Sequence, residues 1–212
     1  MATKCYKLTA QDNTTMNNTL WGEGISHSTS GKGGLCSAGW LHAYSHPLLA
    51  VLLSSIHVSF MTPKLWEAYG SGLKKNDRGL KIGFTKLTTK KEIALPTITI
   101  TQKVAFAILC ALEVYKETNF VTWANNWLSN KDRTADAAND AINAAANATY
   151  DAANAAYDAA HAAWYAANAA CFRNAVDVAS AANAANAANA ANAACFHKNI
   201  NLIKIAKKAM KY

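Results

Sequence analysis

The chain has 212 residues, enough for one large domain or two small ones, and it carries a formal net charge of +8. It contains no run of 18 apolar residues, so we expect no membrane-spanning helix, and its first residues lack the apolar core of a secretory signal. The five cysteines are widely spaced and form no CxxC pair. This favours reduced thiols, and therefore a cytoplasmic protein, over a disulfide framework.

The charge is unevenly distributed along the chain. Residues 64–91 hold eight Lys or Arg against two acids, whereas residues 132–177 hold six Asp against two Arg. Residues 195–212 hold five Lys and no acid. A basic surface attracts nucleic acids, nucleotides or acidic proteins, but it can also serve only solubility, and both interpretations stay open.

Glycine and proline disappear along the chain. All ten glycines lie at or before Gly83, and all three prolines lie at or before Pro96. These residues end helices and mark turns, so their loss predicts a helical second half. We therefore expect an α+β protein, with a small mixed N-terminal domain over residues 1–98 and an alanine-rich antiparallel helical bundle over residues 99–212.

The elements of the first domain follow in chain order. KCYKLT (4–9) alternates and predicts a strand, and SGKGGLCSAGW (30–40) is a glycine-rich loop. HPLLAVLLSSI (46–56) predicts a short buried helix with proline in its first turn. LKIGFTKL (80–87) and EIALPTITI (92–100) alternate or carry β-branched residues, which predicts two further strands.

Two helices are expected to open the second domain. Thr101 can cap the first, and Asn119 can cap the second, which buries a stripe containing Phe120, Trp123 and Trp127. The last segment, residues 199–212, is amphipathic and predicts a terminal helix with a solvated lysine face.

Between them lies an alanine tract, with 32 alanines in residues 135–194. The tract has a strong helix propensity. Large side chains recur in it every seven residues, at Tyr150, Tyr157 and Trp164, and His161 occupies a polar position of the same repeat. We expect these four residues to form an interface, either within the bundle or in a homo-oligomer. Tyr157 and Trp164 should be buried against another helix.

The tract ends in AANAANAANAANAA (181–194), where asparagine recurs every third residue. One α-helix is the simplest prediction, packed along the helix of residues 150–172 or along its copy in another subunit. A chain reversal would then fall near FRNAVD (172–177). Three-residue steps drift by about 60° around an α-helix, so the asparagines should not all be buried.

Residues 30–47 look most like a ligand site. Lys32 and Gly33 lie in a run of glycines whose N–H groups could cradle a phosphate, although the P-loop spacing is absent and a plain turn stays open. His42, Tyr44 and His46 alternate, which would place them on one face of a strand, and the two histidines could bind a metal. A metal would need a third ligand with suitable spacing, which is not evident, and we expect no metal or cofactor.

Two further possibilities involve this part of the chain. Cys36 and His42 could act as nucleophile and base, although a buried thiol is the simpler interpretation. Lys74, Lys75 and Arg78 lie among aromatic residues, a mixture that suits a nucleotide or single-stranded nucleic acid. The same lysines could instead only protect the edge of a sheet.

Two stretches resemble proteins of phages and bacteria. LCSAGWLHAYSHPLLAVLL, preceded by YKLT, is similar to a small N-terminal domain with a Cys, Gly, His, Pro-Leu pattern, here Cys36, Gly39, His42 and Pro47-Leu48. VAFAILCALEVYKETNFVTWANNWLSNKDRTADAA with the alanine tract resembles alanine-rich proteins often labelled as immunity proteins. The resemblance implies a phage or mobile-element origin, and it implies no catalytic residues.

We therefore expect a non-catalytic phage accessory protein in the host cytoplasm. It would engage a host immune component or its nucleotide-derived signal through Lys32, Gly33, His42, Tyr44, Lys74, Lys75 and Arg78. A nucleic-acid-binding protein using Lys74, Lys75, Arg78, Lys81 and the C-terminal lysines is one alternative, and a structural or toxin-neutralising immunity-like protein is another. An enzyme using Cys36, His42 or His46 is less favoured.

Overall fold

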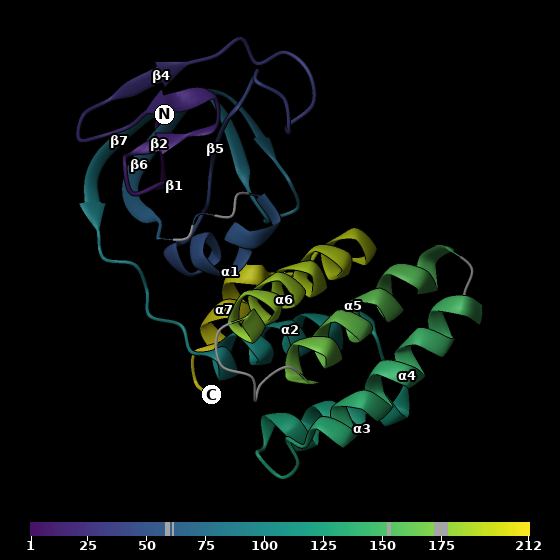
Figure 1. Ribbon diagram of the computed structural model, residues 1–212. Coiled ribbons are helices and arrows are strands. Elements are labelled where there is room, and N and C mark those ends of the chain that lie inside the picture. Colours follow the sequence, from purple (N-terminus) through teal and green to yellow (C-terminus); the bar gives the residue numbers. More distant parts are fainter. Residues whose placement is uncertain (58–59, 61, 152–153, 172–177) are drawn as a thin grey trace. The chain divides into compact units, whose positions relative to one another are not determined.

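The computed structural model describes residues 1–57, 60, 62–151, 154–171 and 178–212 (Figure 1). It describes the side chains in these ranges except at 55–57, 147–151, 154–160, 171, 178–185 and 197. The chain divides into two compact units, Met1–Thr97 and Ile98–Tyr212. Strands lie in the first unit, and six of the seven described α-helices lie in the second, which confirms an α+β chain.

Five strands form one antiparallel sheet in the first unit, in the order β1–β6–β7–β4, and β5 also pairs with β7. A short hairpin of β2 and β3 and helix α1 complete the described part of this unit. The bounds are β1 Thr3–Thr9, β2 Thr14–Thr15, β3 Thr19–Leu20, β4 Ser26–Ser28, β5 Leu41–Ala43, α1 Pro47–His57, β6 Lys64–Asn76 and β7 Ile82–Ile93. The strands predicted at 4–9 and 80–87 and the helix predicted at 46–56 are confirmed.

The strand predicted at 92–100 is wrong. Strand β7 ends at Ile93, and helix α2 already begins at Ile100. Pro96 has no N–H to donate to a sheet, and Thr99 turns the chain into the helix as its N-cap. The long strand β6 was not predicted from the sequence. It pairs with both β1 and β7, and so it takes the place in the sheet that residues 92–100 were expected to fill.

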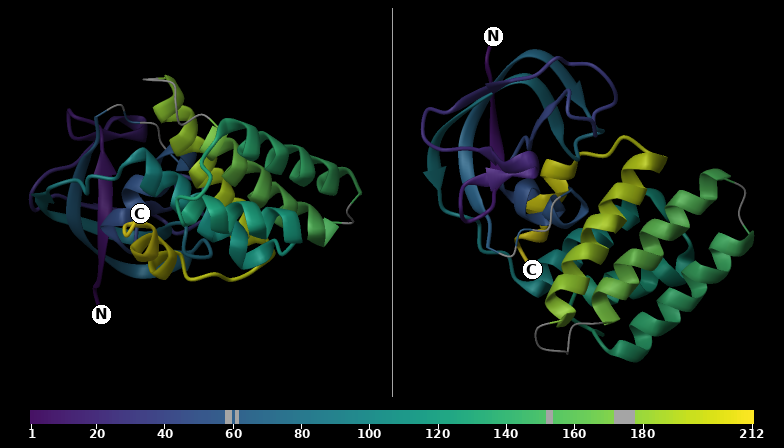
Figure 2. Two further views of the ribbon diagram at one scale, coloured as in Figure 1. Left: turned by 90° about the horizontal axis from the view of Figure 1, so that it is seen from below. Right: turned by 45° about the horizontal axis from the view of Figure 1, so that its top comes forward.

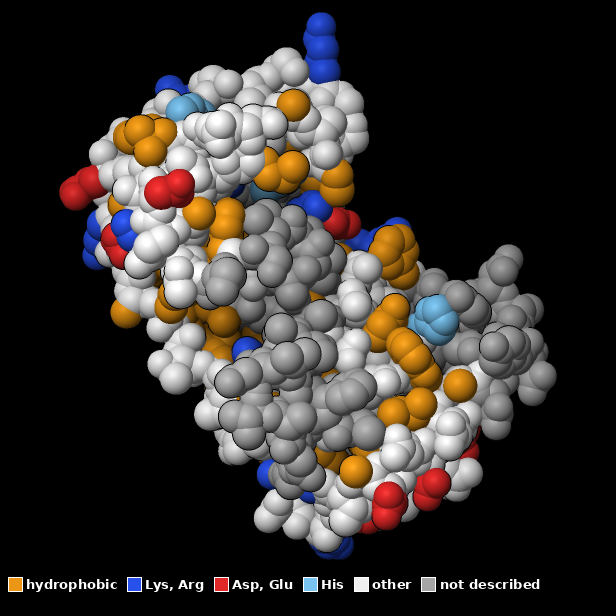
Figure 3. Space-filling view, in the orientation of Figure 1, with side chains coloured by type: hydrophobic (Ala, Val, Ile, Leu, Met, Phe, Trp, Pro, Cys, Tyr) orange, Lys and Arg blue, Asp and Glu red, His pale blue; other side chains and the backbone are white. Residues whose placement is uncertain are grey.

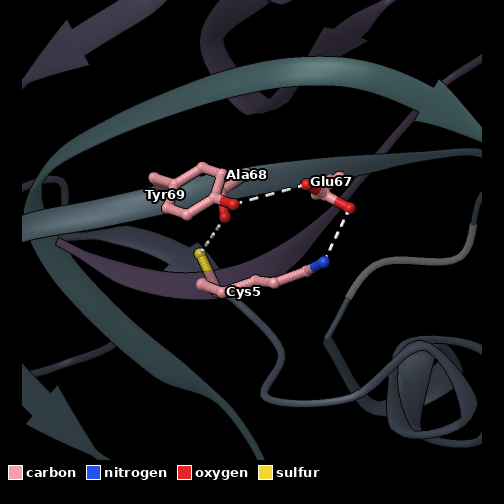
Figure 4. A network of polar contacts seen from close by, with 5 residues as sticks. Cys5, Glu67, Ala68 and Tyr69 are labelled. Carbon is pink, nitrogen blue, oxygen red and sulfur yellow. Dashed lines mark hydrogen bonds and ion pairs between the residues drawn. The ribbon is translucent and has the colours of Figure 1, made fainter.

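Alternation along β1 decides which of its side chains face inward. Cys5, Lys7 and Thr9 are buried on one face and Leu8 on the other, whereas Lys4 is exposed and forms an ion pair with Glu67 at 2.8 Å. In Figure 4, Tyr69 donates to the same carboxylate at 3.5 Å, and Cys5 donates to the carbonyl of Ala68 at 3.5 Å. Burial raises the pKa of Cys5 to about 12, so this thiol stays protonated. The buried face of β1 thus carries a lysine, Lys7.

Helices make up the described part of the second unit. Their bounds are α2 Ile100–Val114, α3 Thr118–Leu128, α4 Ala135–Asp151, α5 Asn154–Cys171, α6 Val178–His197 and α7 Leu202–Ala209. The cap expected at Thr101 is wrong, because Thr99 caps α2 and exchanges hydrogen bonds with Gln102. The cap expected at Asn119 is also wrong, because Glu117 accepts the free N–H groups at the start of α3.

Helix α5 packs against both α4 and α6, and the three helices run in alternating directions (Figure 2). The AAN repeat lies on α6 and is helical, and α6 packs along α5. The predicted reversal at 172–177 lies outside the described residues. On the face drawn in Figure 3, the acidic side chains of this unit lie at its α4 edge.

On the part of α5 whose side chains are described, the buried residues are alanines and not aromatic residues. Ala162, Ala163, Ala166, Ala167, Ala169 and Ala170 are at most 3% exposed. Trp164, which was expected to be buried, is half-buried, and its ring contacts Tyr165 on the same helix. Small side chains bring helix backbones close together, and a large ring then has room only beside the contact.

Candidate functional site

The first unit contains a pocket of about 390 Å³, a size typical of small-molecule sites. Strands β1 and β5, the β2–β3 hairpin and the glycine-rich loop contribute to its walls. The lining residues are Lys7, Leu8, Thr15, Met16, Asn17, Thr19, Trp21, Thr29, Cys36, Ser37, Ala38, Trp40, Leu41, His42, Tyr44, Phe60 and Lys81.

Lys7 is the first of two buried lysines in this lining. It is 8% exposed, its ammonium donates to the carbonyl of His42 at 3.0 Å, and it lies 4.9 Å from the ring centre of Trp21. Burial lowers the pKa of Lys7 to about 8. Near neutral pH the side chain is therefore still charged, but its positive charge is held away from water.

Lys81 is the second buried lysine, directly before β7. It is 7% exposed, and its ammonium lies 3.1 Å from the sulfur of Cys36. Within the described part of the chain, neither Lys7 nor Lys81 forms an ion pair with a carboxylate. Buried charges without a partner are costly, so the two ammonium groups favour any anion that enters the pocket.

His42 lies near both lysines. Its Nε2 is in contact with the carbonyl of Leu35 and therefore carries the proton of the neutral ring. Burial lowers the pKa of His42, and the positive charges of Lys7 and Lys81 lower it further. The imidazole is thus neutral near pH 7 and adds a polar but uncharged group to the wall.

Two tryptophans border the pocket with fixed apolar rings. Trp21 donates its indole N–H to the hydroxyl of Thr15 at 2.9 Å, and Trp40 donates to the carbonyl of Gly33 at 3.3 Å. Both side chains are at most 5% exposed, and these hydrogen bonds fix their rings. Fixed indoles beside ammonium groups match a ligand that combines a planar ring with an anion.

Seven residues were predicted to bind a ligand, and two of them, His42 and Tyr44, line this pocket. Lys32 and Gly33 are exposed on the glycine-rich loop outside the lining. Internal hydrogen bonds hold that loop, because Ser37 donates to the carbonyl of Lys32 at 3.1 Å.

The basic residues that were predicted to bind a ligand lie at the end of the β6–β7 hairpin. Lys74, Lys75 and Arg78 are exposed and do not line the pocket. Lys75 donates to the carbonyl of Gly33 at 2.9 Å and lies 4.7 Å from the ring centre of Trp40. It therefore fastens the glycine-rich loop to the hairpin and supports one wall of the pocket from outside.

The pairing proposed for Cys36 and His42 does not appear, because each side chain contacts another group, Lys81 and Leu35 respectively. The expectation of a buried Cys36 thiol is also wrong, because Cys36 is exposed at the pocket. Lys7, Trp21 and Trp40 were missed as site residues, and Lys81 was named only for the alternative of nucleic-acid binding. A signal for Lys7 existed, because it shares one face of a predicted strand with Cys5, a residue type that is usually buried.

The predicted interface residues lie on α4 and α5. His161 and Trp164 are half-buried, and their ring centres lie 6.5 Å apart. The side chains of Tyr150 and Tyr157 lie outside the described residues. The role of these four residues as an interface stays a prediction.

Among the described residues, no three His, Cys, Asp or Glu side chains gather into a possible metal site. No described helix has the length and apolar character needed to cross a membrane. Comparisons with protein-family models, curated proteins and solved structures found no match. The function therefore has to be argued from the pocket itself.

Proposed function

We propose that the protein is a non-catalytic binding protein whose first unit holds a small anionic ligand with a flat ring, such as a nucleotide. The observation that carries this proposal is the pair of buried lysines, Lys7 and Lys81, in one pocket with no acid among its described lining residues. An anion supplies the counter-charge that these ammonium groups lack, and lysine is a common phosphate ligand.

The remaining lining fits the other parts of such a ligand. Trp21 and Trp40, although at most 5% exposed, border the pocket with apolar ring atoms that a base can contact. The hydroxyl of Thr15 accepts from Trp21 and can donate to a phosphate, whereas those of Thr19 and Thr29 donate to backbone carbonyls and can only accept from a sugar hydroxyl. A nucleophile with a positioned base is not among these contacts, because the neutral His42 already donates to Leu35. Binding without catalysis is therefore the simpler role.

The resemblance to alanine-rich phage and bacterial proteins supplies a biological setting for this proposal. A phage accessory protein that binds the nucleotide-derived signal of a host immune system, or the component that makes it, needs such a pocket and no catalytic group. In that setting the alanine-rich helices serve as scaffold and, through His161 and Trp164, as an interface between subunits.

Calorimetric titration with adenosine monophosphate, adenosine and inorganic phosphate tests the proposal. We expect the nucleotide to bind more tightly than either part alone. Lys7→Met and Lys81→Met should each weaken it by about tenfold or more, while the exposed Lys90→Met should leave it unchanged. If a panel of nucleoside mono-, di- and cyclic phosphates shows no binding, or if Lys90→Met weakens it equally, the proposal is wrong.

A nucleic-acid-binding protein is the second candidate. It is favoured by the exposed end of the β6–β7 hairpin, where Lys74 and Lys75 stand beside the exposed Leu73. Steeply salt-dependent binding of single-stranded DNA, lost in Lys74→Glu/Lys75→Glu and kept in Lys81→Met, would favour it over the pocket ligand.

A further inference from the structure

One thiol at the pocket has no role in the proposed function. Cys36 is exposed and lines the pocket, whereas Cys5, Cys110 and Cys195 are buried. Burial also raises the pKa of Cys110 well above its ordinary range, so that thiol is inert. Among the cysteines whose side chains are described, only Cys36 is open to a reagent from solution.

The surroundings of Cys36 add a second, independent feature. The ammonium of Lys81 is buried and aimed at the sulfur at 3.1 Å, and it has no other hydrogen-bond or ion-pair partner within the described part of the chain. Reactive cysteines occur in such electropositive and partly exposed places, because the thiolate is the nucleophilic form of the side chain.

We propose that Cys36 is a thiol-modification site for small anionic disulfides of the glutathione class, selected by the charge of the pocket lysines. The inference rests on the proposed function in one respect, since both use the cationic pocket. The thiol of Cys36 gives its proton to water as its sulfur attacks one sulfur of the disulfide, a new sulfur–sulfur bond forms, and the old one breaks. The other half leaves as a thiolate and takes a proton from water, so no further oxidant is needed.

The pocket explains why the reagent should be anionic. The attacking sulfur stands beside Lys81, and Lys7 lies in the same lining, so carboxylates of the reagent find ammonium groups on arrival. Clefts of one sign raise the local concentration of oppositely charged molecules by about tenfold to a thousandfold. A cationic disulfide of similar reactivity meets the opposite field. The mixed disulfide would then fill the pocket and exclude a nucleotide.

The wild-type protein allows a test without any substitution. It is mixed separately with oxidised glutathione and with cystamine, a cationic disulfide, and adducts are counted by intact mass spectrometry. Each rate is divided by the rate of the same reagent with N-acetylcysteine at the same pH. We expect a single glutathione adduct, located on Cys36 by peptide mapping, and a normalised rate about tenfold or more above that of cystamine. Equal normalised rates, or an adduct on another cysteine, would overturn the proposal.

Variants then separate this proposal from the proposed function. Cys36→Ser should take up no glutathione but still bind adenosine monophosphate. Lys81→Met should lose the preference for the anionic reagent, and Lys90→Met should keep it. If wild type and Lys81→Met show the same preference while nucleotide binding still depends on Lys81, the thiol proposal fails alone. If selective modification occurs but no nucleotide binds, the proposed function fails alone.

Discussion

Replacing Lys7 by methionine should change how the stability of the first unit depends on pH. Methionine keeps most of the apolar length of the side chain and removes the buried charge. The pKa of Lys7 is lowered from 10.5 to about 8, so the unfolded chain holds the proton more tightly than the folded one. Stability therefore rises with pH between these two values. One pKa unit corresponds to about 1.4 kcal/mol, so the penalty is about 3 kcal/mol at pH 7 and about 1.4 kcal/mol at pH 9.5.

Urea unfolding followed through the indole N–H signals of Trp21 and Trp66 reports on this unit alone. From pH 7 to pH 9.5, wild type should gain about 2 kcal/mol more than Lys7→Met, since all other titrating groups are shared. At pH 7 the lost hydrogen bond to His42 offsets part of the gain from removing the charge. Lys90→Met serves as the exposed control and should follow wild type. Parallel pH profiles for wild type and Lys7→Met would show that Lys7 is not buried with its charge.

Three further changes test other parts of the fold. Gly70→Ala would place a methyl group 2.4 Å from ring atoms of Phe84, and should destabilise the first unit by about 2 kcal/mol or more in urea unfolding; an unchanged midpoint would contradict that packing. Thr99→Ala breaks the reciprocal cap with Gln102 and should cost about 1 kcal/mol, seen as faster amide exchange in the first turn of α2 only. Trp127→Phe removes an indole N–H without a partner among the described residues but also opens a cavity beneath Arg133, so it should cost about 1–3 kcal/mol, whereas more than about 4 kcal/mol would reveal a hidden partner of the N–H.

The helical second half could be predicted because its signal is local. Alanine propensity and the loss of glycine and proline act within a few residues and need no knowledge of the partner helix. Strand β6 was missed for the opposite reason. Its second half, from Gly72 to Asn76, is exposed and basic, so the charge of the stretch concealed the alternation of Trp66, Ala68 and Gly70 before it.

The pocket could be predicted only in part, because burial of a lysine depends on tertiary structure. His42 and Tyr44 share a predicted strand face, and that local pattern brought both into the candidate site. Lys7 and Lys81 are 74 positions apart and belong to different elements, and lysine is rarely fully buried. Because lysine is rarely buried, the sequence alone places both Lys7 and Lys81 at the surface. Lys75 illustrates the converse, since it is exposed as expected but holds the glycine-rich loop in place.

The asparagines of the AAN repeat should tolerate alanine but not leucine. Ala187, Ala188, Ala190, Ala191 and Ala194 are at most 1% exposed, whereas the asparagines between them are half-buried. Asn186, Asn189 and Asn192 step by about 60° each around the helix, and all three are half-buried, so none of them occupies the closest contact. Replacing Asn186, Asn189 and Asn192 by alanine should keep the unfolding midpoint or raise it, because alanine gains about 0.5 kcal/mol of helix propensity at each site. Leucine at the same three positions should expose apolar surface and cause aggregation, seen by light scattering. Ala188→Leu provides the packed comparison and should cost about 1–3 kcal/mol through overpacking. If the triple alanine variant lost more than about 2 kcal/mol, the amides would instead be buried hydrogen-bonding groups that hold α6 in place.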